Sequence, residues 1–265
     1  GQLAQMIDEC IEKKGLKCDL NHIDVSRIQK MDYLFEDSKF NGSIDQWDTS
    51  NVRTMKGMFA NSKFNGHISA WNVSQVLDMS YMFCKSRFNS DVCAWDVSNV
   101  TTMEAMFESS VFKGDISAWN TSRVISMMDM FQGGAFNNNI SAWDVSKVEH
   151  MERMFEKSKF KQDLSQWLPT SCAHMDYMFE DKVLCSFKNP TMAIWYAVEH
   201  YGFDVKKCKP AVQNYYDATR SVLEILGMDY NKIPYAMQQG WINAQSNSPI
   251  LALPIFENHL DSDVH

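Results

Sequence analysis

Large apolar residues recur along most of the chain at an interval of 24 residues. Tryptophan stands at positions 47, 71, 95, 119, 143 and 167, a phenylalanine series runs from Phe35 to Phe179, and a methionine series runs from Met31 to Met175. Periods of about 20 to 29 residues are typical of leucine-rich-repeat solenoids, in which each coil buries its apolar face against the next. The pattern therefore predicts a stack of seven coils.

Two local periods alternate within each unit. The tetrapeptide WDVS has apolar residues at every second position, which predicts a short strand. The following SNVTTMEAMF places Val100, Met103, Met106 and Phe107 at steps of three or four, which predicts a short helical turn capped by the hydroxyl of Ser98. The expected fold class is an α/β solenoid, leucine-rich-repeat-like, with strands stacked on one side and helical turns on the other.

Both ends of the chain depart from the repeat. Apolar residues from Leu3 to Ile11 mark one face of a helix that ends at Gly15, and residues 1–15 are expected to cap the first coil. The solenoid is expected over residues 16–186. Residues 187–265 lose the 24-residue step and predict an all-α C-terminal domain. Its helices are expected after Pro190, from Pro210 and near Pro234, before an extended acidic tail.

The repeated unit, with its Trp-Asp-x-Ser and Met-Phe pairs, resembles the BspA-like leucine-rich-repeat proteins of bacteria. The resemblance covers about residues 16–183, and the C-terminal region resembles no family that we recognise. That family comprises surface antigens and lipoproteins that bind host proteins, with further members inside cells or in mobile elements. The resemblance implies a solenoid fold and a protein-binding role.

Composition narrows the classes of function. The 265 residues include 25 Lys and Arg against 33 Asp and Glu, so a formal charge of -8 disfavours nucleic acid as a partner. No apolar run approaches the roughly 18 to 20 residues that span a bilayer. Seven scattered cysteines without a Cys-x-x-Cys pair suit a reducing compartment, so we expect a cytoplasmic protein. The alternative is the bacterial cell surface, if a leader has been removed.

Candidate chemistry is sparse, and we predict no catalytic residue, metal or cofactor. His150 and His174 are 24 residues apart with Cys172 nearby, but other coils carry Thr, Asp or Ser at the histidine position, which indicates an outward, variable site rather than zinc. His200 lacks a recognisable nucleophile partner. Motifs for phosphate, dinucleotide or hydrolase sites do not occur. An unrecognised enzymatic activity in residues 187–265 stays open as an alternative.

A polar ladder follows the tryptophans. The residue after each tryptophan is acidic or an amide, and it should point away from the core. One interpretation is that these side chains cap the following turn, and the other is an acidic strip for a basic partner. The ladder consists of Asp48, Asn72, Asp96, Asn120 and Asp144.

The first functional hypothesis is a non-enzymatic scaffold that recognises and occupies or recruits a partner protein, of unknown identity, through the solenoid surface or the C-terminal helices. A surface adhesin lacking its leader is the alternative. Solenoids encode specificity at outward positions that vary between coils, and Tyr and Arg often anchor interfaces. Candidate contact residues are therefore Tyr81, Arg153 and Tyr177, with the ladder and the C-terminal aromatics Trp195, Tyr196 and Tyr201 as competing patches.

Overall fold

The computed structural model describes residues 1–162, 164, 167, 171, 172, 174, 177–179, 198, 202, 204–208 and 210–227. The chain divides into two compact units, Gly1–Leu184 and Cys185–His265. The helices expected after Pro190 and near Pro234, and the acidic tail, lie outside the described residues.

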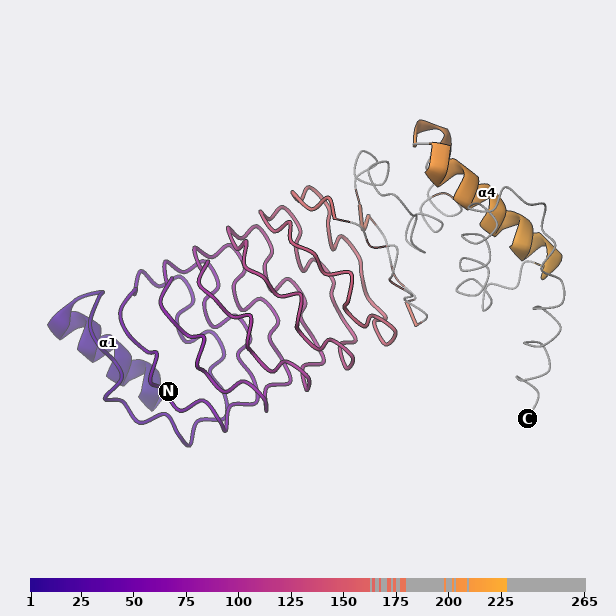
Figure 1. The fold of residues 1–265 in the computed structure, drawn as a ribbon. Coiled ribbons are helices and arrows are strands. Elements are labelled where there is room, and N and C mark those ends of the chain that lie inside the picture. The colour runs from indigo at the N-terminus through magenta and orange to yellow at the C-terminus, as the bar shows by residue number, and fades with distance from the viewer. Residues whose placement is uncertain are drawn as a thin grey trace, which may run out of the picture. The chain divides into compact units, whose positions relative to one another are not determined.

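Helix α1 spans Gln2–Lys14 and lies at the N-terminal end of the coils (Figure 1). Its Ile7 is buried, and Cys10 Sγ lies 3.6 Å from His22 Nε2 of the first coil. The helix ends at Gly15, whose φ of 86° suits a residue without Cβ and whose N–H donates to the Ile11 carbonyl. The helix predicted before Gly15 is confirmed.

Successive 24-residue segments of the first unit lie side by side (Figure 1) and are joined through their backbones. From each methionine of the Met31 series onward, every second backbone N–H donates to a carbonyl of the next coil, as the Gly57 N–H does to the Ser80 carbonyl at 2.8 Å. The alternate N–H groups donate to carbonyls of the same coil and so form turns, as the Met58 N–H does to the Met55 carbonyl at 3.1 Å. A column of single parallel bridges runs through Lys30, Thr54, Asp78, Thr102, Ser126, His150 and His174.

Local structure differs from the sequence prediction in two ways. The described WDVS segments are not strands. The repeating column of backbone bridges lies instead four residues after the end of each such segment, one residue before each methionine of the Met31 series, and a further bridge joins Asp19 and Ser43. The predicted helical turns, such as the one over Val100 to Phe107, are runs of overlapping turns. The reason is that half of the N–H groups bond to the next coil, so they cannot form the local ladder of an α-helix.

Aromatic rings and methionines fill the interior of the coils. Rings of the Phe35 series stack on one another between coils with centroids 5.3 to 5.9 Å apart. Met31 to Met151 are at most 1% exposed, while Met175 lies outside the described residues. The offset contacts between rings add to the stabilisation from apolar burial.

Each tryptophan also joins two coils through a hydrogen bond. The indole N–H of Trp95 donates to the Ile68 carbonyl at 3.0 Å, and the other five indoles bond in the same way to a carbonyl 27 residues earlier. All six side chains are 2 to 4% exposed. The predicted burial of the tryptophan series is confirmed, and each polar N–H has a partner inside the core.

The second unit contains the described helix α4, Pro210–Ile225, preceded by a short 3-10 helix η1, Val205–Lys207. The helix predicted to open at Pro210 is confirmed. Its buried face includes Val212, Tyr215 and Thr219, and the Gln213 amide donates to the Cys208 carbonyl at 2.6 Å. Among the described residues, none of the helices is both long and apolar enough to cross a membrane.

Candidate functional site: the turn face of the coils

One outward surface of the coils is built by residues with an unusual backbone. The Tyr33 column has positive φ angles of 51 to 60° in every coil, and it comprises Tyr33, Gly57, Tyr81, Ala105, Asp129, Arg153 and Tyr177. The Asp37 column has φ angles of 51 to 62° and comprises Asp37, Asn61, Lys85, Ser109, Gly133 and Lys157. Such a φ costs a residue other than glycine roughly 1 to 2 kcal/mol. The conformation recurs whatever the side chain, because the inter-coil hydrogen bonds fix it.

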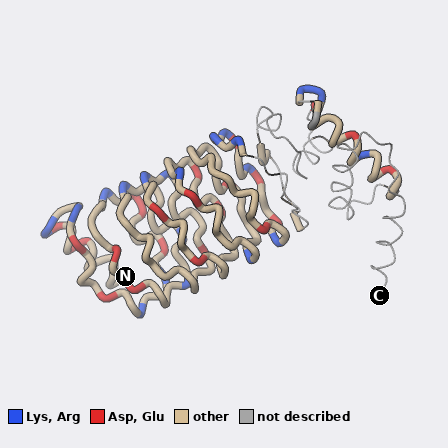
Figure 2. Tube along the Cα trace, viewed as in Figure 1, with Lys and Arg blue, Asp and Glu red and all other residues tan. Residues whose placement is uncertain are grey.

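We call this surface the turn face. It is formed by the Tyr33 and Asp37 columns, together with the columns that begin at Asp32 and Glu36. Acidic and basic residues are interspersed over the first unit (Figure 2). Among the described residues of the turn face, the Asp32 and Glu36 columns have one basic residue, Lys56, against six acidic ones. The acidic residues are Asp32, Glu36, Glu104, Glu108, Glu152 and Glu156.

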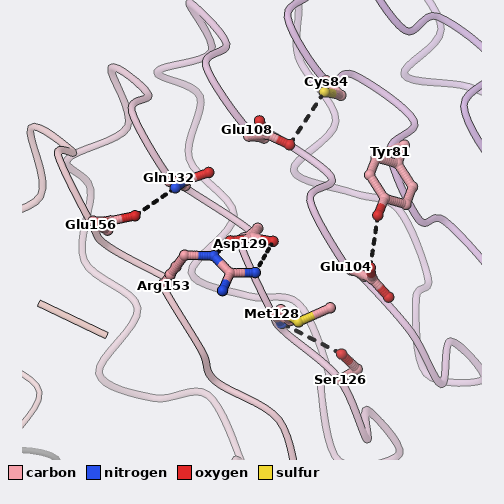
Figure 3. A network of polar contacts seen from close by, with 10 residues as sticks. All are labelled: Tyr81, Cys84, Glu104, Glu108, Ser126, Met128, Asp129, Gln132, Arg153 and Glu156. Carbon is pink, nitrogen blue, oxygen red and sulfur yellow. Dashed lines mark hydrogen bonds and ion pairs between the residues drawn. The ribbon is translucent and has the colours of Figure 1, made fainter. Parts of the chain in front are cut away.

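Side chains of the turn face bond between neighbouring coils (Figure 3). The Tyr81 hydroxyl donates to Glu104 at 2.7 Å, and Gln132 donates to Glu156 at 2.6 Å. Arg153 donates through two nitrogens to the Asp129 carboxylate, at 2.8 and 3.0 Å. These contacts fix the direction of side chains on an already rigid backbone, so the surface is ordered before any partner arrives.

Two titratable groups of this surface, Cys84 and Tyr81, have raised pKa values. Burial, followed by the neighbouring Glu108 carboxylate, raises the pKa of the Cys84 thiol to about 12. The thiol donates to Glu108 at 3.6 Å and stays protonated at neutral pH. The hydrogen bond to Glu104 raises the pKa of Tyr81, so that its phenol is also neutral. Neither group is activated as a nucleophile.

A pocket of about 370 Å³ opens on the turn face near the N-terminal end of the coils. Two tyrosines, Tyr33 and Tyr81, belong to its lining, and Tyr33 is 44% exposed. The other lining residues are Glu36, Asp37, Ala60, Asn61, Cys84 and Lys85. The volume is near the lower end of the range for small-ligand sites, about 300 to 1,000 Å³.

Of the predicted contact residues on the coils, Tyr81, Arg153 and Tyr177 share the Tyr33 column. Tyr81 lines the pocket, Arg153 is engaged with Asp129, and Tyr177 is 67% exposed. The predicted residues Trp195, Tyr196 and Tyr201, and His200, lie outside the described residues. Whether any of them contacts a partner stays a prediction.

The ladder of Asp48, Asn72, Asp96, Asn120 and Asp144 is exposed and caps turns. Each side-chain oxygen accepts the N–H of the serine two residues on, at 2.9 to 3.1 Å. The Ser50 hydroxyl donates to the same Asp48 oxygen at 2.6 Å. The turn-capping interpretation is thus confirmed. At Ser50 and Ser74 the serine hydroxyl, which the sequence predicted as the cap, instead donates to the ladder oxygen.

The histidine pair forms a stack rather than a cluster of ligands. The rings of His150 and His174 lie 4.8 Å apart and nearly parallel, and His150 Nδ1 contacts Glu152 at 3.1 Å. The Cys172 thiol donates to the carbonyls of Glu149 and His174. Within the part of the chain that the structure describes, no group of three His, Cys, Asp or Glu side chains could hold a metal ion.

Several pocket residues escaped sequence reasoning, namely Tyr33, Glu36, Asp37 and Lys85. A signal for Tyr33 was present, since it lies one 24-residue step before Gly57 and two before Tyr81. The charged residues carried no comparable signal, because a single charge on an exposed turn is the ordinary condition of a protein surface.

Comparisons with known proteins bear on the family. Neither the curated proteins nor the solved structures include a match to this chain. Two overlapping segments, residues 2–111 and 84–195, match the family described as "Mycoplasma protein of unknown function, DUF285". Together they cover more than two thirds of the chain, including α1 and the coils. The chain therefore belongs to the DUF285 family.

Proposed function

We propose that this protein is a non-enzymatic binding scaffold whose turn face contacts a partner protein. The observation that carries the proposal is the fixed backbone of the Tyr33 and Asp37 columns, whose φ angles stay within about ten degrees while their residues change from coil to coil. Repeat proteins encode specificity in such positions. The pocket and the exposed Tyr33 and Tyr177 are the kind of surface that interfaces use.

The same proposal assigns the coils to a leucine-rich-repeat-like solenoid related to the BspA-like proteins. Its support is the 24-residue repeat with buried Trp, Met and Phe columns and a parallel backbone bridge that recurs at every 24-residue step from Lys30 to His174. We also place the protein in the cytoplasm, because the six described cysteines carry free thiols, including the exposed Cys93.

Site-specific photo-crosslinking in the native cell tests the partner contact. A photoreactive amino acid would replace Lys85 or Ser109 on the turn face, and Ala70 or Ala94 beside the tryptophans as matched controls. All four positions are exposed. We expect one discrete adduct from the turn-face positions and none from the controls. Adducts of equal intensity from both sets, or none from the turn face, would contradict the proposal.

A further inference from the structure

In the Tyr33 column, Gly57 lies between the two tyrosines that line the pocket. At Gly57, a Cβ atom would lie 2.3 and 2.4 Å from two ring carbons of Tyr33, so the Tyr33 ring occupies the space above this glycine. Tyr81 follows in the next coil of the same column. Cys84 is buried, and Ala60 and Tyr81 are half-buried, whereas the charged lining residues are exposed. The site is therefore an aromatic hollow with a charged rim.

Negative charge dominates the surroundings of this hollow. Glu36 and Asp37 line it, and Lys85 is the one cation among its lining residues. Just beyond the lining, Glu104 accepts from Tyr81 and Glu108 accepts from Cys84 (Figure 3). The hydrogen bond to Glu104 and burial raise the pKa of Tyr81, and the negative charges of Glu104, Asp129 and Glu108 add to this in the same direction.

Two tyrosine rings and an excess of carboxylates suit a planar cation. A guanidinium stacks on aromatic faces and also donates in a fork to carboxylates, which a lysine ammonium does not do as well. An apolar side chain would fit the rings but would bring no partner for the carboxylates of the rim. Asp37 has one oxygen engaged by Asn61 at 2.7 Å, and its carboxylate can accept further bonds.

We propose that the pocket between Tyr33 and Tyr81 binds an arginine side chain of the partner protein. This inference rests on the proposed function and specifies its chemistry. The partner then presents an exposed arginine in a basic segment, and the acidic turn face steers its approach.

The probe is the peptide acetyl-Gly-Arg-Gly-amide, added to the full chain carrying ¹³C-labelled tyrosine rings. Matched peptides with citrulline, which keeps the shape without the charge, and with lysine are the comparisons. Resonances of Tyr33 and Tyr81 are assigned from Tyr→Phe variants. We expect the arginine peptide to shift these two rings with a Kd on the order of millimolar, weakened by salt. The citrulline peptide should leave both rings unshifted.

Substitutions then test the two rings separately. Tyr33→Leu and Tyr81→Leu should each weaken arginine binding by about two- to fivefold, whereas Tyr33→Phe should keep it. Tyr177→Leu, in the same column but away from the pocket, is the matched control and should change nothing. Unfolding midpoints verify that each variant is folded, and Tyr33, being 44% exposed, is the safer of the two sites.

Three results would overturn the inference: no ring shift with arginine, equal binding of citrulline, or equal or tighter binding of lysine. The crosslinking at Ser109 is independent of the pocket, since Ser109 is not among its lining residues. A pocket that rejects arginine while Ser109 still gives an adduct refutes this inference alone. An arginine-binding pocket with no adduct at either turn-face position refutes the proposed partner contact instead.

Discussion

The interior columns and the turn face are built on the same coils, yet their residues follow opposite rules. Inside, one residue type returns at each step, as in the methionine column from Met31 to Met151, at most 1% exposed. Outside, the Tyr33 column holds Tyr, Gly, Ala, Asp and Arg at nearly constant φ. Packing and inter-coil hydrogen bonds thus set the backbone, and the outward side chains are free to differ. The difference separates residues that make the stack from residues that can distinguish a partner.

The largest expected effect tests the interior. Trp95→Ala should lower the free energy of unfolding by about 3 to 5 kcal/mol, because it leaves a cavity and removes the partner of the Ile68 carbonyl. Tyr177→Ala on the turn face should change it by less than about 0.5 kcal/mol. Urea unfolding of both variants measures the contrast. A small loss for Trp95→Ala would break the distinction between the two regions.

The next effect concerns the strained backbone of the turn face. Gly57→Ala should destabilise by about 1 to 2 kcal/mol, because it places a Cβ at a φ of 60° and displaces the Tyr33 ring. Ala105→Gly, at the same column and a φ of 52°, is the matched control. Its change should stay below about 1 kcal/mol, since relief of strain opposes the loss of a buried methyl group. Unfolding midpoints measure both changes. An equal loss of stability in the two variants would show that the positive φ of this column does not strain a residue that carries a Cβ atom.

A smaller effect is expected at the ladder. Asp96→Ala should cost about 1 kcal/mol, because the N–H of Ser98 loses its acceptor in the turn. Asp96→Asn should be nearly neutral, since Asn72 and Asn120 make the same bond in their coils. Thermal unfolding distinguishes the two. A loss from Asp96→Asn as large as that from Asp96→Ala would mean that charge, not the turn bond, is what the position supplies.

The sequence predicted burial much better than it predicted local structure. The 24-residue step places Trp, Phe, Met and Val side chains in register, and register alone decides which of them meet in the core. The helical turn over Val100 to Phe107 was wrong because steps of three and four residues also arise in overlapping turns. Hydrogen bonds between coils decide whether a helix or a run of turns forms, and these bonds join residues 23 to 25 positions apart. No local window of sequence contains both partners.

The candidate site was predictable only in outline. Variation along the Tyr33 column pointed to the turn face and to Tyr81, which lines the pocket. The pocket itself depends on how the rings of Tyr33 and Tyr81 lie, and the Tyr33 ring lies against Gly57 of the next coil. The direction of a ring is a rotamer choice and not a sequence pattern. The positive φ angles at Tyr33, Lys85 and Arg153 could not be predicted from the sequence either, because these residue types have no preference for that conformation.

The smallest effect is a change in acid sensitivity at the ladder. Hydrogen bonds from the side chain and then the backbone of the following serine lower the pKa of Asp48, Asp96 and Asp144. A carboxyl with a lower pKa in the folded state stabilises the fold above its unfolded pKa, about 3.9, and loses this contribution as the pH falls through the folded value.

Replacing Asp48, Asp96 and Asp144 together by Asn removes three of these titrations and keeps the turn bonds. The triple variant should therefore resemble the natural protein at pH 7 and lose less stability between pH 5 and pH 3. Urea midpoints at the three pH values measure this, with Glu9→Gln on the exposed side of α1 as a single-site control for losing a carboxylate. Parallel pH profiles for the triple variant and the natural protein would show that the ladder carboxylates gain nothing from their serines, and would leave their exposed charges free for another role.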